Sequence, residues 1–443
     1  MRSFSLNEKK DLFVFLNPRQ ISINPVFPAD HSMGSRNFLR YIRSKITSEQ
    51  FALLSIAVCN DFRIECHSFF FEDLEDFLVY RKLKMLNVLQ PMPFSYKKIA
   101  NNKRPSWLLV ENEEGKTLLT ISVSPTKEYL LQYASIVQSA VLFLCPRGQR
   151  SASYAKAAHA AEAMKAFYYP EIAEHYSDRL GLTAYLEHTK GPDDVYVIGE
   201  GDKAFAQVIS DGLFVENLHD STSFSVIDLT LPDAIFRIRI IAIKHSFWGS
   251  AAGNVAKVCA ELGSTKGIVY IAKLGAISQK LDLFDMVSPC KFLLWEANKV
   301  THVQAPPAFF DETILSEMGV SQTVHVSLPT LVEETNFLLN HFNVNGAETI
   351  DNEISFIAAS IALVNRAVST PVPFSCLHIV TDKPSSSIFE ELNHYVEVSD
   401  INHLLSKDNL QYRRLKNHHH RHFLEIFNRT IIYERPDIGR AIA

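Results

Sequence analysis

Residues 240–278, IIAIKHSFWGSAAGNVAKVCAELGSTKGIVYIAKLGAIS, decide the fold that the sequence predicts. The apolar run at 240–243 predicts a strand, and the Ser- and Gly-bearing segment 246–253 predicts a loop. Apolar residues at helical spacing over 255–262 predict a helix, and a second apolar run at 268–271 predicts another strand. Two strands joined by such a helix form a right-handed βαβ unit and run parallel, because parallel strands need a crossover connection.

The loops of this unit are the first place to look for a functional site. In sheets of this kind, ligands bind beyond the carboxyl ends of the strands. Both predicted strands end in Gly-containing segments, Ser246–Gly253 and Lys273–Gly275, and a small-residue turn at Gly275 is expected to close the unit. We therefore expect a ligand to lie near these two segments.

The second half of the chain repeats the alternation of strands and helices. The tetrad KGPD at 190–193 is the strongest linker signal, because Gly and Pro break both neighbouring patterns. Strand and helix patterns alternate after it as far as FSCLHIVTD (374–382), and residues 348–367 have the apolar spacing of one long helix. The sequence thus predicts a C-terminal α/β domain over 191–443, with a central mixed sheet.

Residues 1–190 predict a separate α+β domain, or a degenerate α/β domain, of unknown role. Strand predictions at 51–60 and 62–71 indicate an antiparallel pair, and WLLVENEEGKTLLTISVS (107–124) has the signature of a β-hairpin that turns at Glu114-Gly115. The remaining predictions are a strand at 11–17, a basic helix at 35–45, a helix followed by a strand over 129–148, an Ala-rich helix over 152–167, and a helical segment from 170 to 188.

The composition predicts a soluble, cytoplasmic protein. The chain has 443 residues and a net charge of −5, so it has no overall electrostatic attraction for nucleic acid or an anionic membrane. Its six cysteines are scattered without a CxxC pair, which is typical of buried thiols in a reducing compartment. No segment approaches the roughly 18 consecutive apolar residues of a membrane span, and the first residues lack the apolar core of a signal peptide.

Four segments of the second half follow an order that resembles a known superfamily. They are DVYVIGEGDK (194–203), KHSFWG (244–249), IVYIAKLGAIS (268–278), and TIDNEISFIAAS (349–360) followed by HIVTDKP (378–384). Over residues 190–435 this order resembles the nucleoside phosphorylase superfamily, which includes purine nucleoside and uridine phosphorylases, methylthioadenosine nucleosidases and AMP nucleosidase. The resemblance implies a three-layer α/β domain that forms homo-oligomers, needs no cofactor, and cleaves the N-glycosidic bond of a purine nucleoside or nucleotide.

The resemblance also implies roles for particular residues. Asp382 occupies the place of an aspartate that assists the leaving base, and Glu353 that of a glutamate that holds the ribose hydroxyls; Asn352 replaces the usual methionine before it. Such residues suit the reaction, since cleavage passes through a cationic sugar and needs a better leaving group. Without the resemblance, Asp382 would be interpreted as the N-cap of a following helix, and Glu353 as a buried salt-bridge partner.

Two departures from the family favour hydrolysis by water over phosphorolysis. Tyr270-Ile271-Ala272-Lys273 replaces an R-x-G-S pattern, and Phe205 stands where an arginine should follow the first Gly turn at Gly201. The loss of two guanidinium groups removes the bidentate grip that inorganic phosphate needs. Tyr270, Gly201 and Lys273 remain candidates for substrate binding, and Lys273 could hold a 5′-phosphate or pair with an acid.

Two alternative functions stay open. One is a catalytically inactive relative that binds a nucleotide or a protein partner, which the missing arginines favour. The other is true phosphorolysis, with phosphate held by Lys273.

The remaining candidates are less specific. Ser246 could orient a sugar oxygen or a water, although a serine in such a loop is more often a capping residue than a catalytic one. The histidines of the C-terminal region form a basic, solvated helix rather than a metal site, because neighbouring helical residues point in different directions: His418, His419, His420 and His422. The sequence therefore predicts no metal and a small-molecule nucleoside or nucleotide as the partner.

Overall fold

The structure, a computed structural model, describes residues 16–23, 42, 45–89, 105–144, 152–205, 209, 214–230 and 236–384, together with residues 422, 423, 425–427, 429 and 430. The chain divides into two compact units. Apart from the short segment 329–333, which belongs to the first unit, the border between them falls between residues 176 and 177. The sequence predicts the border at the linker tetrad 190–193, so the observed border lies earlier in the chain than predicted.

The first unit is built on a six-stranded mixed sheet with the order β1-β6-β2-β5-β4-β3. The strands are β1 (Arg19–Ile21), β6 (Lys165–Tyr168), β2 (Arg63–Ser68), β5 (Thr117–Val123), β4 (Ser106–Asn112) and β3 (Leu83–Leu89). The central strands β6, β2 and β5 are parallel, and the outer strands pair antiparallel. The predicted hairpin at 107–124 is confirmed as β4 and β5, with Gly115 in its turn at φ +73°.

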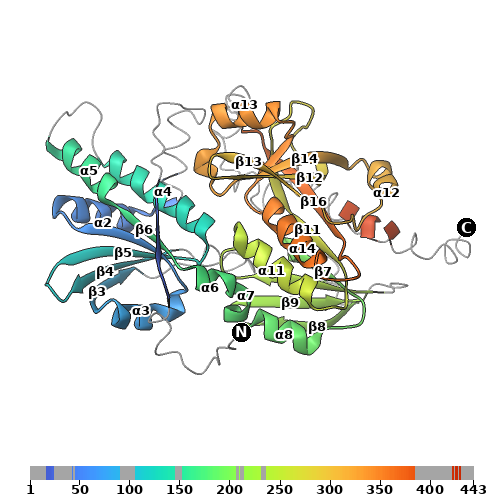
Figure 1. Ribbon diagram of the computed structural model, residues 1–443, viewed down its shortest axis with the longest axis horizontal. Coiled ribbons are helices and arrows are strands. Elements are labelled where there is room, and N and C mark those ends of the chain that lie inside the picture. The colour runs from blue at the N-terminus through green and yellow to red at the C-terminus, as the bar shows by residue number, and fades with distance from the viewer. Residues whose placement is uncertain are drawn as a thin grey trace, which may run out of the picture. The chain divides into compact units, whose positions relative to one another are not determined.

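Helices cover both faces of this sheet. The helices α2 (Ser48–Cys59), α4 (Lys127–Phe143) and α5 (Ala152–Ala163) share one apolar core with Cys66 of β2 and Ala166 of β6 (Figure 1). On the opposite face, His67 stacks on Phe167 and meets the edge of Phe77 in α3 (Leu74–Tyr80). This alternation follows from the two-residue period of a strand.

The strand predicted at 51–60 is wrong, because these residues belong to α2. Thr47 begins the helix with a capping box: its hydroxyl accepts from the Gln50 amide, and the Gln50 side chain accepts from the Thr47 amide at 2.8 Å. This box satisfies two amides that have no partner within the helix. The antiparallel pair of 51–60 with 62–71 therefore does not form, although β2 confirms the second strand.

Other predictions for the first half need smaller corrections. α4 continues as a helix to Phe143, so no strand forms in the described part of 129–148. The Ala-rich helix ends at Ala163, and 165–168 are strand β6. The segment from 170 to 188 is helical as predicted but broken into α6 (Pro170–Glu174), α7 (Tyr176–Leu180) and α8 (Leu182–Thr189). The predictions at 11–17 and 35–45 fall largely outside the described residues.

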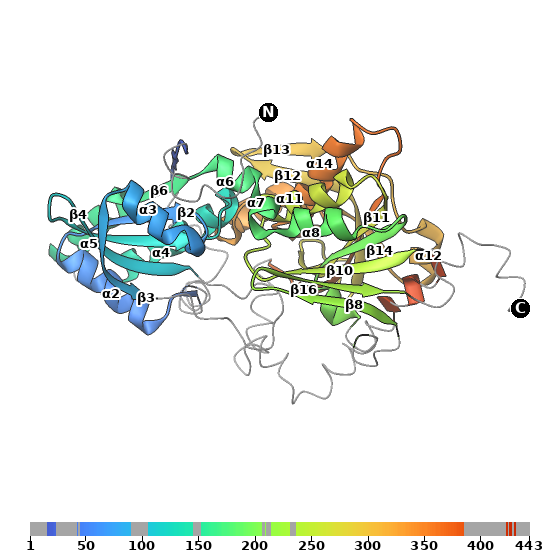
Figure 2. The same cartoon turned by 90° about the horizontal axis from the view of Figure 1, so that it is seen from below.

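The second unit is built on a ten-stranded mixed sheet, which confirms the predicted α/β class with a central mixed sheet. Its strands run β13-β12-β14-β15-β11-β7-β10-β9-β8, and β16 pairs with β11 and β12. The bounds are β13 (Lys299–Val303), β12 (Met286–Glu296), β14 (Ser321–Ser327), β15 (Thr349–Asp351), β11 (Thr265–Ala276), β7 (Asp194–Gly199), β10 (Arg237–Ile243), β9 (Phe224–Leu229), β8 (Val215–Asp220) and β16 (Phe374–Asp382). The antiparallel strands β8, β9 and β10 run side by side at one edge (Figure 2).

The unit predicted at 240–278 forms around a third strand. β10 and β11 both pair parallel with β7, which lies between them, and α11 (Ser250–Glu261) connects them. The helix begins at Ser250, so the loop is shorter than the predicted 246–253. The predicted turn at Gly275 is wrong, because β11 continues through it to Ala276.

Gly275 instead joins two further strands to β11. Gly275 pairs with Ile350 of β15 on one side of β11 and with Asp382 of β16 on the other side. β16 also pairs with β12, β12 with β14, and β14 with β15, so the pairings β11-β16-β12-β14-β15 close into a ring. The carboxyl ends of β16 and β15 therefore meet at the same place on β11.

Helices flank both faces of this second sheet. α11 lies beside α14 (Ile354–Asn365) and contacts β11, and α14 contacts β12 and β14 (Figure 1). Gly253 permits this approach, since a Cβ there would lie 2.6 Å from the Ser360 hydroxyl and 2.9 Å from the Phe356 carbonyl oxygen. On the other face, the apolar core joins strand residues to α9 (Gly201–Ala204), α12 (Glu312–Glu317) and Phe427.

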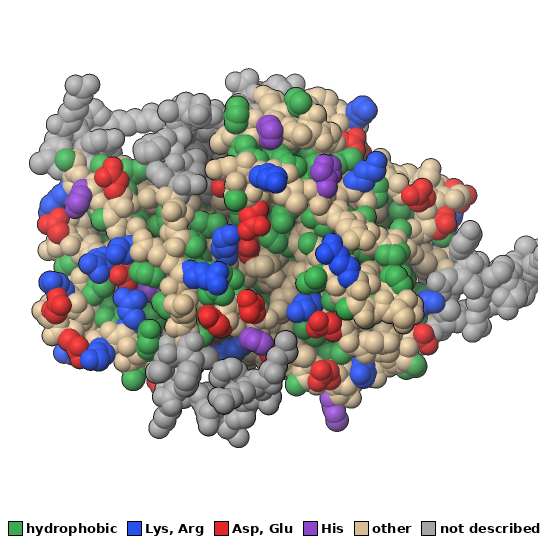
Figure 3. Space-filling view, viewed as in Figure 1, with side chains coloured by type: hydrophobic (Ala, Val, Ile, Leu, Met, Phe, Trp, Pro, Cys, Tyr) green, Lys and Arg blue, Asp and Glu red, His purple; other side chains and the backbone are tan. Residues whose placement is uncertain are grey.

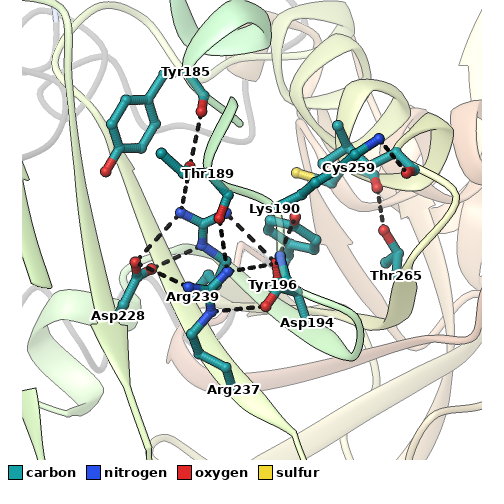
Figure 4. Close-up of polar contacts among 12 residues, drawn as sticks. Tyr185, Thr189, Lys190, Asp194, Tyr196, Asp228, Arg237, Arg239, Cys259 and Thr265 are labelled. Atoms are coloured by element: carbon teal, nitrogen blue, oxygen red, sulfur yellow. Dashed lines mark hydrogen bonds and ion pairs between the residues drawn. The ribbon is translucent and has the colours of Figure 1, made fainter. Parts of the chain in front are cut away.

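A buried charge network fixes the amino end of β7 to β10 and β9 (Figure 4). Arg239, fully buried in β10, donates from Nε to Asp228 at 2.8 Å and from Nη2 to the Thr189 hydroxyl at 2.8 Å. Arg237 donates from Nε to Asp194 at 2.8 Å. Because buried carboxylates are costly unless paired, the two arginines make Asp194 and Asp228 tolerable in the sheet.

Candidate active site

Asp351 organises the place where β15 passes into α14. Its Oδ1 accepts from His325 Nε2 at 2.7 Å and from the Ser327 hydroxyl at 2.7 Å. Its two carboxylate oxygens also accept from the backbone amides of Glu353 and Ile354 at 3.0 to 3.1 Å. A carboxylate that receives amides at a helix start is favoured by the helix dipole, so Asp351 anchors α14.

These contacts keep Asp351 charged. Burial by itself raises the pKa of this carboxyl, but the nearby His325 and the hydrogen bonds from His325 and Ser327 outweigh burial and hold it below the ordinary value. His325 is itself fixed, with Nδ1 2.9 Å from the Thr349 hydroxyl. Since most of its accepting capacity is occupied, Asp351 orients its surroundings and is poorly placed to take a proton.

Glu353, two residues later, behaves in the opposite way. It is the N-cap residue of α14 and makes no side-chain capping bond, so the prediction that it lies within the helix is wrong. Burial raises the pKa of Glu353 well above its ordinary value and the charge of Asp351 raises it further, whereas a backbone hydrogen bond and one from the Tyr270 hydroxyl act in the opposite direction. The pKa values of these two neighbouring acids are thus shifted in opposite directions.

Tyr270, a residue of β11, lies beside Glu353 and hydrogen-bonds its carboxyl group. Its ring lies 5.7 Å from Phe247 and 4.7 Å from His378, centroid to centroid. Burial raises the pKa of Tyr270 well above its ordinary value, with Glu353 and Asp351 adding to the effect. The hydroxyl therefore stays protonated and can donate to a carboxylate.

Gly199 makes room for the Tyr270 ring at the end of β7. A Cβ at Gly199 would lie 2.5 Å from Tyr270 Cε2 and 2.5 Å from the Ile271 carbonyl oxygen, and the backbone has φ +88°. Both the space and the left-handed conformation require glycine here. Glycine at position 199 thus allows the Tyr270 ring to pack against the end of β7.

Partly exposed residues cluster at this end of the sheet. Residues 194–198 of β7 and 267–271 of β11 are buried, whereas Gly199, Glu200, Ala272 and Lys273 are partly exposed, as is Glu353. Lys273 Nζ lies 3.5 Å from a carboxylate oxygen of Glu200. Lys273 therefore has an acid beside it, the second of the two roles that the sequence left open for it.

The other predicted substrate-binding residues lie in the same unit. Asn352 is buried, and its side-chain amide donates to the Leu328 carbonyl oxygen at 2.8 Å, which ties β14 to the start of α14. Gly201 opens α9, and a Cβ there would lie 2.6 Å from Val197 Cγ1. Ser246 is buried in the loop that precedes α11. Their roles in binding stay predictions.

Asp382 is the last residue of β16, at the carboxyl end of the strand as predicted. Gly275 pairs with Asp382 on one side and with Ile350 on the other, so these two backbones are two strand spacings, roughly 10 Å, apart. Glu353 follows Ile350 by three residues. The chain thus brings the backbones that carry both predicted acids to one end of the sheet.

Two histidines of this region were not predicted from the sequence as site residues. His325 in β14 and His378 in β16 are both fully buried, and both lie near Asp351. Each sits in an apolar strand run, TVHVS and SCLHIV, where a polar side chain is costly unless it is used. A histidine inside an otherwise apolar strand is therefore the sequence signal that could have identified these two residues.

The described residues hold no group of three or more His, Cys, Asp or Glu arranged to bind a metal ion. His418, His419 and His420 lie outside them, and His422 is half-buried. None of the helices in the described ranges is long and apolar enough to cross a membrane. Acidic and basic side chains are interspersed on the face shown in Figure 3, without a continuous basic surface among the residues described there.

Comparison with known proteins gives one relative by sequence. No protein-family model matches the chain. The oxidoreductase cns1 of Cordyceps militaris is 24% identical over 274 residues, which cover 60% of this chain and 33% of that protein. The chain thus spans about a third of the length of this curated relative.

Solved structures similar to the chain include nucleosidases. The 5′-methylthioadenosine/S-adenosylhomocysteine nucleosidase of Campylobacter jejuni matches with a TM-score of 0.37 and 10% identity, over 54% of this chain and 98% of that one. The futalosine hydrolase of Helicobacter pylori matches with a TM-score of 0.36 and 10% identity, over 55% and 99%. At these identities the likeness concerns the fold and does not extend to an activity.

Proposed function

We propose that the second unit cleaves the N-glycosidic bond of a nucleoside or nucleotide by hydrolysis, with a purine as the leaving base. The observation that carries the proposal is the pair of neighbouring carboxyl groups, Asp351 and Glu353, whose pKa values are moved in opposite directions. Environments that separate the pKa values of adjacent acids are characteristic of acid–base and charge-stabilising sites.

Each residue has a role in this proposal. Glu353, once ionised, accepts a hydrogen bond from a sugar hydroxyl and stabilises the positive charge that develops on the sugar. Tyr270 donates to Glu353 and orients it, while Asp351 holds the start of α14. Asp382 hydrogen-bonds or protonates the base as it leaves, which lowers the barrier to C–N cleavage.

Water is the proposed nucleophile because Lys273, the lysine considered for holding phosphate, is engaged. Lys273 lies beside Glu200, which offsets its charge. With Phe205 fully buried in the apolar core, the position of the family's second phosphate-binding arginine offers no cation either. A bidentate grip on inorganic phosphate therefore has no support among these residues.

The test is an assay for free base. The full-length protein is incubated with adenosine, inosine, guanosine, uridine, 5′-methylthioadenosine and AMP, with and without inorganic phosphate. Base released equally in both conditions is expected. Release only with phosphate would support phosphorolysis, and no release from any of them, with an unaltered melting temperature, would support a binding or interaction protein.

Asp382→Asn tests the acid at the end of β16. We expect turnover to fall by about 10²- to 10⁴-fold, since general acid catalysis contributes that much, while the melting temperature stays near that of the wild type. Asp311→Asn, at the exposed start of α12, is the control, because it can affect only a helix cap. Unchanged turnover in Asp382→Asn would remove this residue from the mechanism.

A further inference from the structure

His378 carries a cost that the fold does not explain. The side chain is fully buried, and neither ring nitrogen has a hydrogen-bond partner. A buried polar group left without a partner costs about 1–3 kcal/mol, so folding alone disfavours histidine here. On the same strand, Leu377 and Ile379 face the apolar core of the opposite side of the sheet.

The position of His378 connects it to the candidate active site. It pairs with Ala272 of β11, so its side chain shares a face of the sheet with Ala272 and Tyr270. Its ring meets the edge of the Tyr270 ring, with 4.7 Å between centroids at an interplanar angle of 71°. Ala272 is partly exposed, as is Glu353, whose carboxyl accepts from the Tyr270 hydroxyl.

We propose that His378 is a further ligand-binding residue of this site, and that its ring nitrogens hydrogen-bond separate hydroxyl groups of the bound sugar, one nitrogen as donor and the other as acceptor. The inference rests on the proposed function only in the choice of a sugar as ligand. A neutral imidazole presents one N–H donor and one acceptor, and sugar hydroxyls suit both, since a hydroxyl can accept from the N–H and another can donate to the bare nitrogen. An ammonium or a carboxylate would satisfy one nitrogen at most.

The charges around the ring are consistent with a neutral imidazole. Burial lowers the pKa of His378 to about 3, and the proximity of His325 lowers it as well, whereas Asp351 and Glu200 act in the opposite direction. The ring therefore enters the bound state without a charge. Its orphaned nitrogens keep full hydrogen-bonding strength in a site of low dielectric constant.

The experiment compares stability and binding in three variants, with adenosine and D-ribose as probes. His378→Leu removes both nitrogens, His378→Asn keeps a donor and an acceptor, and Ile379→Val alters the opposite face of the same strand. We expect His378→Leu without ligand to unfold at or above the wild-type temperature, because an unpaired polar group has been removed. We also expect its affinity for adenosine to fall at least tenfold, while His378→Asn retains part of the affinity and Ile379→Val all of it.

The outcomes separate this inference from the proposed function. Equal adenosine affinity in wild type and His378→Leu would overturn the inference, even if the wild type releases base. Binding that depends on His378 without any release of base would support the inference and contradict the hydrolysis. If neither probe binds the wild type, the inference fails. Should His378→Leu not fold, ¹⁵N resonances of His378 in the wild type that do not move on addition of adenosine would overturn it.

Discussion

At the scale of single residues, the protonation of Glu353 sets the expected pH dependence of activity. Burial and the charge of Asp351 disfavour the carboxylate, so Glu353 keeps its proton above the pH at which glutamate ordinarily loses it. The carboxylate that stabilises a cationic sugar is therefore lost as pH falls through this raised pKa. We expect the acid limb of kcat/KM to lie above the ordinary range of a glutamate.

Glu353→Gln tests this assignment. We expect kcat/KM to fall by about 10²- to 10³-fold, as when one charge-stabilising group is removed, and the acid limb to disappear. Glu312→Gln, an exposed change at the start of α12, is the matched control and should leave the profile as it is. An unchanged acid limb in Glu353→Gln would assign the titration to another group.

Part of this candidate site was predicted from the sequence, and the rest was not, for a physical reason. The motif order pointed to Glu353, Asp382 and Tyr270, because such motifs lie at strand ends. His325 and His378 were missed, since a histidine inside an apolar run has no spacing that reveals its neighbours. The partners of these two rings lie on other strands and become visible only when the sheet closes.

At the scale of elements, Gly199 joins the end of β7 to β11 and offers a prediction with an internal control. Gly199→Ala combines a left-handed backbone with a Cβ that would lie only 2.5 Å from the Ile271 carbonyl oxygen and from Tyr270 Cε2. Gly263→Ala, after α11, has φ +74° but nothing within 4 Å, so it carries the backbone strain alone. We expect about 1 kcal/mol for Gly263→Ala and about 1–3 kcal/mol more for Gly199→Ala.

Urea unfolding of the two glycine variants measures this difference. The free energy of unfolding of each is compared with that of the wild type, and Tyr270 must shift in Gly199→Ala to relieve the overlap. Base release, where the wild type shows it, should therefore fall in Gly199→Ala and persist in Gly263→Ala. Equal destabilisation by both changes would contradict this prediction, because it would mean that Tyr270 moves away from the added Cβ at little cost in free energy.

The charge network of β7, β9 and β10 gives a second prediction at this scale. Arg239→Met leaves Asp228 buried beside a single partly exposed arginine, Arg237, whose Nη1 lies 3.7 Å from Asp228. Breaking a buried ion pair in this way costs about 3–5 kcal/mol. Arg237→Met should cost less, because its side chain is 25% exposed and Arg239 still lies 3.5 Å from Asp194. Equal losses in urea unfolding would contradict this ranking.

Elements were predicted best where the pattern has one interpretation. The hairpin of β4 and β5 has strand alternation and a Gly turn, and both strands form where expected. FALLSIAV at 51–58 is apolar without alternation, which fits a helix and a buried strand alike, and only the Thr47–Gln50 capping box decides for α2. Similarly, the start of α14 depends on Asp351 receiving its first amides, so the apolar spacing placed the helix too early.

At the scale of the whole molecule, buried neutral histidines predict a loss of stability in mild acid. His378 has a pKa of about 3 when folded, against about 6.5 in an unfolded chain. Burial also lowers the pKa of His67 in the first unit, although Glu65 acts in the opposite direction. Between the unfolded and folded values the unfolded chain binds more protons, so the free energy of unfolding decreases as pH falls below about 6.5.

His378→Leu measures the share of this effect that belongs to one residue. Each proton bound only by the unfolded chain contributes about 1.4 kcal/mol per pH unit, so the variant should lose a slope of this size between pH 6 and pH 4.5. Glu353 opposes this trend with the reverse sign, because its raised pKa stabilises the fold at low pH and that stability is lost as pH rises. Urea unfolding at several pH values in this window, with Ile379→Val as control, provides the measurement. Parallel pH profiles for wild type and His378→Leu would show that His378 gains its proton in the folded protein, and would contradict its assignment as a neutral donor and acceptor.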